Sequence, residues 1–207
     1  MRVNTPEIVE AASRMLSTPL QRLTDTSSYV RCQALKTLSR LAEEKVLRDA
    51  FNDVAAEGLH RLLDKNANVR KCALQLFATL LEMNPFCPAF PRETLEERRE
   101  DLLQSLTAEQ ASAAVPGTEA EEGAEGTRAE TESEHSKERN AALALVEKAL
   151  AFEETMSKHL TTVMQFLSSQ TSYDVVEAMN AIVTAHRFEL QVVDLTHQHA
   201  NRPAHPR

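Results

Sequence analysis

Residues 25–44 read DTSSYVRCQALKTLSRLAEE, and residues 64–83, which begin 39 positions later, read DKNANVRKCALQLFATLLEM. The two segments share identical residues at several paired positions, among them Asp25/Asp64, Val30/Val69, Arg31/Arg70, Ala34/Ala73, Leu35/Leu74 and Leu41/Leu80. The apolar members recur every three or four residues, which is the spacing of one face of an α-helix. This stretch therefore predicts a helix that occurs twice, as the second half of a repeated unit.

The residues between the two copies supply a first helix for the second unit. Over 50–63 the apolar residues again follow helical spacing: Phe51, Val54, Ala55, Leu59, Leu62 and Leu63. A period near 40 residues with two helices per unit is typical of HEAT and armadillo repeats. We therefore expect an all-α fold, a HEAT/armadillo-like solenoid of helical hairpins. The presence of only four glycines in 207 residues also argues against sandwiches, barrels and glycine-loop nucleotide folds.

A third helical hairpin is expected over 140–190. The sequence predicts a long helix, with residues 152–156 as a possible break in it. A turn over 168–172 and a return helix follow. The residues expected to face inward on the return helix are Val176, Met179, Ile182 and Val183. When Ala178 is aligned with Ala34, Val175 stands where the repeat has its arginine. The segment is therefore either a degenerate repeat or a hairpin of another kind.

The net charge of −8 comes mostly from one segment. Residues 108–139 carry nine acidic and three basic side chains, whereas residues 1–107 carry equal numbers of each. Val115 is the only large aliphatic residue of that segment, so it can bury too little apolar surface to offset its ordering entropy. We expect HEAT-type repeats over 1–107, a disordered acidic linker over 108–139, a helical hairpin continuing the solenoid over 140–190, and a frayed tail over 191–207.

Two charged residues recur with the repeat. Asp25 and Asp64 end the turn between the two helices of a unit, while Arg31 and Arg70 stand in the first turn of the second helix. In a stack of units, the aspartate of one can reach the arginine of its neighbour. The four residues are therefore expected to form a ladder that sets the register of the units, with exposed pairs that add little stability. The alternative is that all four are ordinary solvated charges.

No catalytic, cofactor-binding or metal-binding site is expected. The chain lacks the GxxxxGK[ST] phosphate loop and the HExxH zinc motif. The histidines of residues 197–205 lie in a proline-containing tail without a rigid partner ligand, which makes a weak metal site. No apolar run approaches the ~20 residues of a membrane span. The three cysteines form no CxxC pair and are expected to be reduced thiols that fill space: Cys32, Cys72 and Cys87.

Basic residues in and after the second helix of the first unit are candidates for contact with DNA. They are Lys36, Arg40 and Lys45. Phosphate binding needs only clustered positive charge. Acidic residues such as Glu43 and Glu44 interleave with them, so a solvated face of mixed charge is the alternative.

Several local sequences resemble, in order and spacing, those of the condensin complex subunit 1 family, the HEAT-repeat "D" subunits among the non-SMC subunits of condensin. They are DTSSYVR at 25–31, DKNANVR at 64–70, ALQLF at 73–77 and LLEMNPF at 80–86. FLSSQTSYDVVEAMNAIVTAHRFEL at 166–190 is similar to the helix pair that follows the family's acidic insert. The family usually carries a proline-containing link where this chain has residues 46–49. Family members are several times longer, so we expect a fragment or a truncated form.

The resemblance implies a non-catalytic scaffold that contributes to mitotic chromosome condensation. It implies the kleisin and SMC subunits of condensin as partners, DNA or chromatin as a further contact, and neither a membrane nor a small-molecule substrate. The expected location is the nucleus and the chromosome, with the cytoplasm as a second location outside mitosis. The alternatives are a generic HEAT-repeat adaptor of the transport or phosphatase type and a small metal-dependent helical enzyme.

Overall fold

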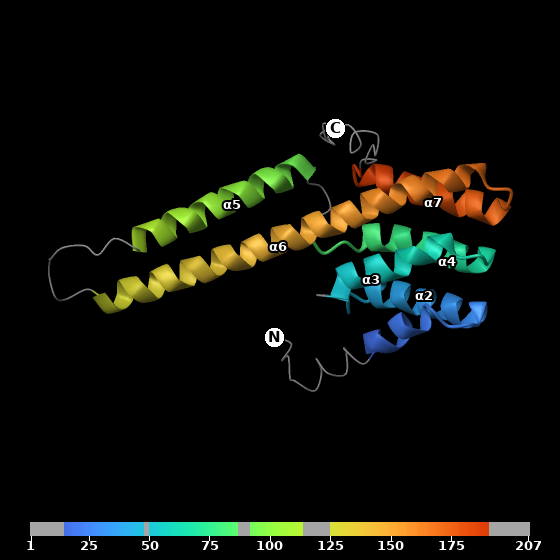
Figure 1. Cartoon of the computed structure of the whole chain (residues 1–207), viewed down its shortest axis with the longest axis horizontal. Coiled ribbons are helices and arrows are strands. Elements are labelled where there is room, and N and C mark those ends of the chain that lie inside the picture. Colours follow the sequence, from blue (N-terminus) through green and yellow to red (C-terminus); the bar gives the residue numbers. More distant parts are fainter. Residues whose placement is uncertain (1–14, 48–49, 87–91, 114–124, 191–207) are drawn as a thin grey trace, which may run out of the picture. The chain divides into compact units, whose positions relative to one another are not determined.

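The computed structural model describes residues 15–47, 50–86, 92–113 and 125–190, and all the regular elements within these ranges are helical (Figure 1). The prediction of an all-α fold is confirmed. The chain divides into two compact units, one formed by residues 1–85 with 154–207 and the other by residues 86–153. The boundary between the units lies within the longest helix, α6 (Glu125–Gln165).

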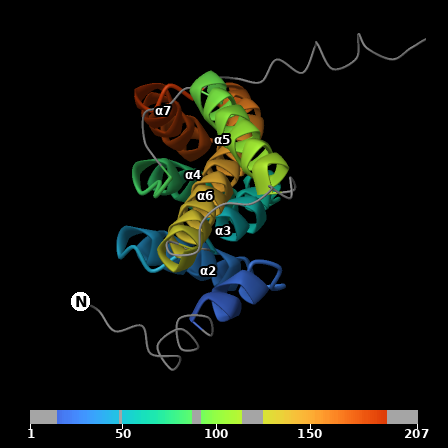
Figure 2. The same ribbon diagram turned by 90° about the vertical axis from the view of Figure 1, so that its left-hand side faces the viewer.

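Three helical hairpins make up the described part of the first unit. Each ends in a helix of 16 residues: α2 (Ser28–Glu43), α4 (Ala67–Glu82) and α7 (Ser172–Arg187). The helices that precede them are residues 15–22, α3 (Phe51–Leu59) with η2 (His60–Leu63), and the end of α6 with η3 (Phe166–Ser168). Helices α2, α4 and α7 lie side by side in that order, as two perpendicular views show (Figures 1 and 2). The hairpins therefore stack as consecutive repeats of a solenoid.

The middle helix, α4, provides the centre of the core. Its predicted apolar face is buried: Val69, Ala73, Leu74, Phe77 and Leu80 are all 0% exposed. Full burial of a side chain such as leucine or phenylalanine is worth about 1.5–3 kcal/mol. The repeat pattern therefore identified the residues that hold the hairpins together.

The helix α3 approaches α4 closely because of a glycine. A Cβ atom built on Gly58 would lie 2.6 Å from Cδ2 of Leu76, closer than non-bonded carbon atoms pack, so the end of the Leu76 side chain would have to shift. Leu59 and Leu62 are buried beyond it, but Leu63, which the helical spacing placed on the same face, is 78% exposed, so that placement is wrong. The chain tightens into the 3₁₀ turn η2 at this point, which rotates its last residue away from the core.

The buried face of α7 differs from the predicted one. Val176, Met179 and Val183 are more than half exposed, so the prediction that they face inward is wrong. The residues buried instead are small: Ala178, Ala181 and Ala185. Small side chains allow the backbone of α7 to come close to α4, and a periodicity of apolar residues cannot detect that preference. The large apolar side chains consequently form a solvent-facing stripe.

Helices extend into the segment 108–139, which was expected to be a disordered linker. α5 (Arg92–Ala113) covers its first residues and α6 its last ones, while residues 114–124 lie outside the described ranges. Alanine, glutamate, arginine and lysine are strong helix formers. A helix that is already nucleated by packed residues gains one hydrogen bond for each residue added. The helix propensity of these residues thus extends α5 and α6 into a segment that has almost no large apolar side chains to bury.

The second unit pairs α5 with the first part of α6. Arg92 at the start of α5 donates to Glu153 at 2.9 Å, and the rings of Phe86 and Phe152 lie 5.9 Å apart. α6 runs through residues 152–156 without the possible break considered above. The expected tail, residues 191–207, lies outside the described ranges.

Candidate functional site

The three hairpins turn through the same hydrogen-bonded loop. In the first two, a side-chain oxygen of Asp25 or Asp64 accepts the amide N–H of the residue two positions later, at 2.9 Å in each case. In the third hairpin, Oγ of Ser169 accepts the corresponding amide at 3.2 Å. These are Asx and Ser/Thr turns, which reverse a chain by replacing a backbone contact with a side-chain one. Ser169 therefore occupies the place of the repeat's aspartate.

The structure brings Arg31 and Asp64 together across the first two repeats. Nε and Nη2 of Arg31 donate to the two carboxylate oxygens of Asp64 at 2.8 and 2.9 Å, and the side chains are only 8% and 5% exposed. Nη1 of Arg31 donates to the backbone oxygens of Asp25 and Thr26 at 2.7 and 3.1 Å. One guanidinium group therefore holds its own turn and the turn of the next repeat. We call such an inter-repeat pair a rung.

The Arg31–Asp64 rung keeps both groups charged. Burial raises the pKa of the Asp64 carboxyl, but hydrogen bonds from Arg31 and from the Asn66 amide outweigh that effect, so its pKa lies below the usual value. The hydrogen bonds to Asp64 raise the pKa of Arg31 against the opposing effect of burial. The sequence suggested exposed rungs of little energetic weight. Because this rung is buried, removal of one partner leaves an uncompensated charge in the protein interior.

A second rung joins the second and third repeats. Nη2 and Nε of Arg70 donate to Oδ2 of Asp174 at 2.6 and 3.1 Å, and the Asp174 side chain is 0% exposed. The third donor to Oδ2 is the Ser169 hydroxyl at 3.1 Å. Nη1 of Arg70 donates to the backbone oxygens of Asp64 and Lys65, just as Arg31 holds its own turn. The side chains of Asp64 and Arg70 thus each pair with a residue of a different repeat.

Asp174 is the rung residue that sequence reasoning missed. It stands five positions after Ser169, in the first turn of α7, whereas the other repeats carry their acidic residue in the turn itself. Its only signal in the sequence was an acidic residue within an expected core helix. Asp25, at the other end of the ladder, forms an exposed pair with Arg22 of its own repeat at 3.2 Å.

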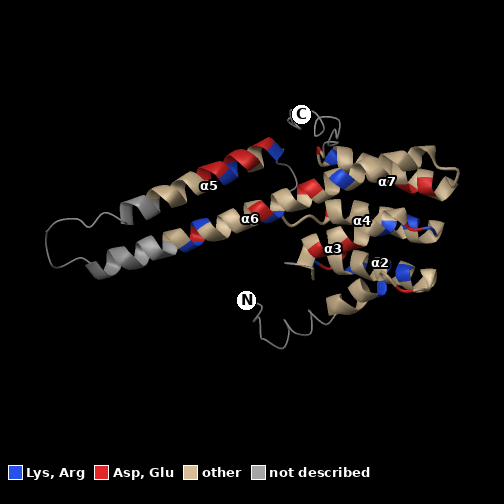
Figure 3. Ribbon diagram, viewed as in Figure 1, with Lys and Arg blue, Asp and Glu red and all other residues tan. Residues whose placement is uncertain are grey.

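The DNA candidates lie together on the exposed side of α2 and beyond its end. Lys36 and Arg40 stand one helical turn apart and are exposed, and Lys45 follows the helix with a positive φ of 55°. None of the three forms an ion pair with an acidic residue in the described part of the chain. Figure 3 shows basic residues on α2 and α4 and acidic residues on α3 nearby. Both signs of charge are therefore present on the helices of the first two repeats.

A polar seam lines the junction of α4 and α7. Glu177 accepts a hydrogen bond from Gln75 at 2.9 Å and forms an ion pair with Lys71 at 3.6 Å. The Lys71 ammonium group also lies 5.0 Å from the centre of the Tyr173 ring. At that distance a cation and an aromatic face attract each other. Beside the Arg70 rung, this seam fixes α7 against α4 with polar contacts.

The described residues form neither a metal cluster nor a membrane-spanning helix. No group of three or more His, Cys, Asp or Glu side chains in those ranges could hold a metal ion. None of the helices in the described ranges combines the length and the apolar character needed to cross a membrane. Histidines 197, 199 and 205 lie outside these ranges.

One histidine should make the stability of the protein depend on pH. The ring of His159 on α6 lies 5.9 Å from that of His60, and burial together with the positive charge that His60 can carry lowers the pKa of His159 to about 4. The unfolded chain binds a proton at His159 near pH 6.5 and the folded one does not, so stability falls as the pH drops from about 6.5 to about 4. We expect a loss of about 1–3 kcal/mol in urea titrations at pH 4.5 relative to pH 7.

The variant His159→Gln isolates this contribution. Glutamine does not titrate, so the difference in unfolding free energy between pH 7 and pH 4.5 should shrink by the same amount. His186, which is exposed on α7, provides the matched control through the same substitution, His186→Gln. An unchanged pH dependence in His159→Gln would show that this ring titrates normally in the folded protein.

Comparison with known proteins identifies relatives, although no family model matches the chain. The Condensin-1 complex subunit CAP-D2 of Arabidopsis thaliana is 39% identical over 103 residues, which are 47% of this chain and 7% of the relative. Condensin complex subunit 1 of Xenopus laevis is 39% identical over 83 residues, or 39% of this chain and 6% of the relative. The human condensin complex subunit 1 is 31% identical over 124 residues, or 56% of this chain and 9% of the relative.

These similarities confirm the resemblance to condensin complex subunit 1 that the repeat motifs suggested. The chain spans less than a tenth of the length of each of these relatives. The similarity therefore concerns one segment of much longer proteins.

Proposed function

We propose that this chain, which is related in sequence to one segment of condensin complex subunit 1, is a non-catalytic HEAT-repeat scaffold of a condensin complex. In that role it contributes to mitotic chromosome condensation, with the kleisin and SMC subunits as its protein partners. The observation that carries the proposal is the agreement between this relationship and the stack of three hairpins joined by buried Arg–Asp rungs. Its place of action would be the chromosome in the nucleus, with the cytoplasm as a second location outside mitosis.

The geometry supports a scaffold because the repeats are fixed in register. Each rung ties the turn of one repeat to the side chain of the next, so neighbouring hairpins are held by bonds of defined direction as well as by the core. The apolar stripe of α7 is formed by Tyr173, Val176, Met179 and Val183, each more than half exposed. Clustered apolar side chains of this kind are typical of surfaces that bind other proteins. The scaffold role needs neither a catalytic group nor a cofactor.

Affinity isolation tests the proposal. The full chain, tagged and expressed in mitotic cells of its source, should co-purify with kleisin and SMC subunits. The variant Arg31→Met/Arg70→Met, which removes both rungs, should lose these partners, while the exposed-pair variant Arg22→Met should keep them. Recovery of transport receptors or phosphatase subunits in their place would support the generic HEAT adaptor and contradict a condensin role.

Contact with DNA is a separate part of the proposal and has its own test. The triple variant K36E/R40E/K45E should bind duplex DNA more weakly at low salt, because three positive charges that can neutralise phosphates are reversed. The slope of the logarithm of affinity against the logarithm of salt concentration should fall by about 3, roughly one for each lost phosphate contact. Fluorescence anisotropy over a series of salt concentrations measures this slope.

A control must carry the same change of net charge. The variant R98E/K158E/R187E reverses three exposed basic residues on α5, α6 and α7. It should retain the salt slope of the parent chain. Equal slopes for the parent and K36E/R40E/K45E would assign these three residues to a solvated face of mixed charge.

A further inference from the structure

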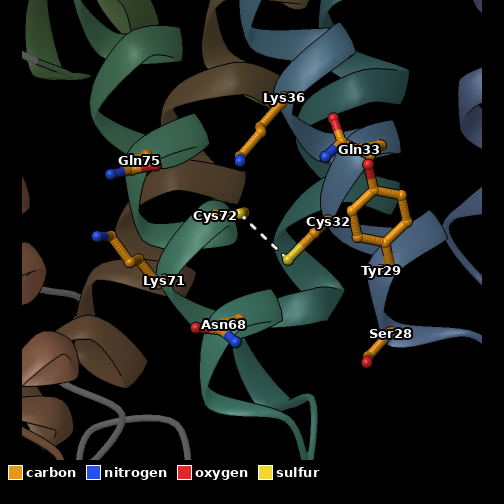
Figure 4. Close-up of a pocket in the computed structure, with 9 residues that line it drawn as sticks. All are labelled: Ser28, Tyr29, Cys32, Gln33, Lys36, Asn68, Lys71, Cys72 and Gln75. Carbon is orange, nitrogen blue, oxygen red and sulfur yellow. Dashed lines mark hydrogen bonds between the residues drawn. The ribbon is translucent and has the colours of Figure 1, made fainter.

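Two cysteine thiols from consecutive repeats are in contact. Cys32 belongs to α2 and Cys72 to α4, and their sulfur atoms lie 3.3 Å apart, joined by a hydrogen bond (Figure 4). The two residues are 8% and 5% exposed. They lie beside a surface pocket of about 460 Å³ whose other lining residues include Lys36, Lys71, Gln33 and Gln75. A small polar molecule in this pocket would therefore reach the two sulfur atoms.

We propose that Cys32 and Cys72 form a reversible disulfide that locks the first repeat to the second when the protein meets a peroxide. The bond length of a disulfide is about 2.05 Å, so the sulfur atoms need to approach by only about 1.3 Å. The site is thus a modification site already assembled by the stacking of the repeats.

The pairing of the two thiols is specific to the contact between α2 and α4 and does not follow from the repeat sequence. With the repeat offset of 39, the position equivalent to Cys32 is Lys71, and the position equivalent to Cys72 is Gln33. The two thiols therefore do not occupy one shared consensus position. They meet because adjacent positions of neighbouring repeats face each other across the contact between α2 and α4. A reduced thiol that only fills space does not require a second thiol as its neighbour.

The surroundings of Cys72 give the two thiols different roles. The sulfur of Cys72 is hydrogen-bonded to that of Cys32, and both residues are buried at the contact between α2 and α4. Burial, and then the bond to Cys32, raise the pKa of Cys72 to about 12, although Lys36 and Lys71 oppose the shift. Cys72 therefore keeps its proton. We assign Cys32 as the attacking sulfur and Cys72 as the resolving thiol.

The reaction balances with hydrogen peroxide as the oxidant. The Cys32 thiolate attacks one peroxide oxygen, the O–O bond breaks, and Cys32 becomes a sulfenic acid while hydroxide leaves and takes up the proton that Cys32 had lost. The Cys72 sulfur then attacks the Cys32 sulfur, the S–O bond breaks, and the Cys72 proton leaves with that oxygen as water. Two thiols and one peroxide thus give one disulfide and two waters. Two electrons pass from the sulfur atoms to the peroxide.

The consequence of the disulfide is a covalent link between the first two repeats, which the Arg31–Asp64 rung also joins. Arg31 precedes Cys32 directly in the chain, and the segment closed by the disulfide, residues 32–72, contains Asp64. A cross-link over a loop of this length restricts the unfolded chain strongly. The oxidised protein should therefore unfold about 10 °C higher than the reduced one.

Peptide mapping of the full folded chain tests the proposal. After treatment with hydrogen peroxide, the protein should lose about 2 Da, show a peptide in which Cys32 is linked to Cys72, and return to its original mass with dithiothreitol. The Cys87→Ser variant should give the same linked peptide. In Cys72→Ser the sulfenic acid of Cys32 has no resolving thiol, so dimedone should label Cys32.

Three outcomes would overturn the proposal. A link from Cys72 to Cys87, or a link between two chains in place of the Cys32–Cys72 link, would show that the contact does not direct the reaction. A Cys32–Cys72 link that forms only in urea would show that the folded contact between α2 and α4 prevents the reaction. Absence of any link from the folded parent chain, with both thiols still reduced, would show that the two cysteines only fill space. The peptide map of the parent chain tests the proposal even if a substituted variant fails to fold.

Discussion

Replacement of Arg31 by methionine is expected to lower the free energy of unfolding by about 3–5 kcal/mol. Methionine retains an apolar side chain of similar length but removes the two hydrogen bonds to Asp64 and the two to the turn of its own repeat. The carboxylate of Asp64, which is only 5% exposed, then remains charged without its partner. Urea denaturation followed by circular dichroism measures the loss.

Two variants separate this effect from a general loss of charge. Arg22→Met removes an arginine from an exposed pair, with the arginine side chain 63% exposed, and should change stability little. The double variant Arg31→Met/Asp64→Asn no longer leaves a charge buried, so it should be more stable than Arg31→Met alone. Equal effects of Arg31→Met and Arg22→Met would mean that the rung is open to solvent and contributes nothing specific.

Replacement of Asp174 by leucine is expected to lower the free energy of unfolding by about 3–5 kcal/mol and to loosen α7 from α4. The carboxylate is 0% exposed and accepts bonds from Arg70 and Ser169, so its removal leaves the partly buried guanidinium group of Arg70 without a counter-ion. Hydrogen exchange should show the largest loss of protection in α7. The described part of the structure gives α7 no other buried ion pair with α4.

Glu177 provides the matched control on the same helix. It also contacts α4, through Gln75 and Lys71, but Lys71 is 34% exposed and can be solvated when its partner is removed. Glu177→Leu should therefore cost less than about 1 kcal/mol and leave the protection of α7 nearly unchanged. If Asp174→Leu and Glu177→Leu have the same effect, the second rung has no special role.

The core of the first two repeats was predictable because it follows from a pattern that occurs twice. Helical spacing places Leu35 and Leu74 at equivalent positions, and both are 0% exposed. The aspartate and arginine positions also recur at the repeat offset, as Asp25/Asp64 and Arg31/Arg70. This recurrence is visible in the sequence and indicated a pair between repeats. Burial of that pair was not visible, because it depends on the helices that cover the turn.

The third repeat was harder to predict because its signals are displaced. Arg70 and Asp174 are 104 residues apart, and Asp174 does not align with the aspartates of the other turns. Neither periodicity nor repeat comparison can identify a contact of this kind. The same limit explains the orientation of α7, where the small residue Ala181 is buried and the larger Val183 is exposed. Where α7 packs closely against α4, a small side chain fits the contact better than a larger and more hydrophobic one.

A double-mutant cycle between Arg70 and Asp174 tests most directly the central claim that the chain forms one stack of three repeats. The unfolding free energies of the parent chain, Arg70→Met, Asp174→Leu and the double variant give the coupling energy of two residues that only the stack brings together. The account predicts a coupling of about 2 kcal/mol or more, as expected for a buried ion pair with hydrogen bonds. Additive effects, with a coupling below about 0.5 kcal/mol, would contradict the placement of the third hairpin against the second.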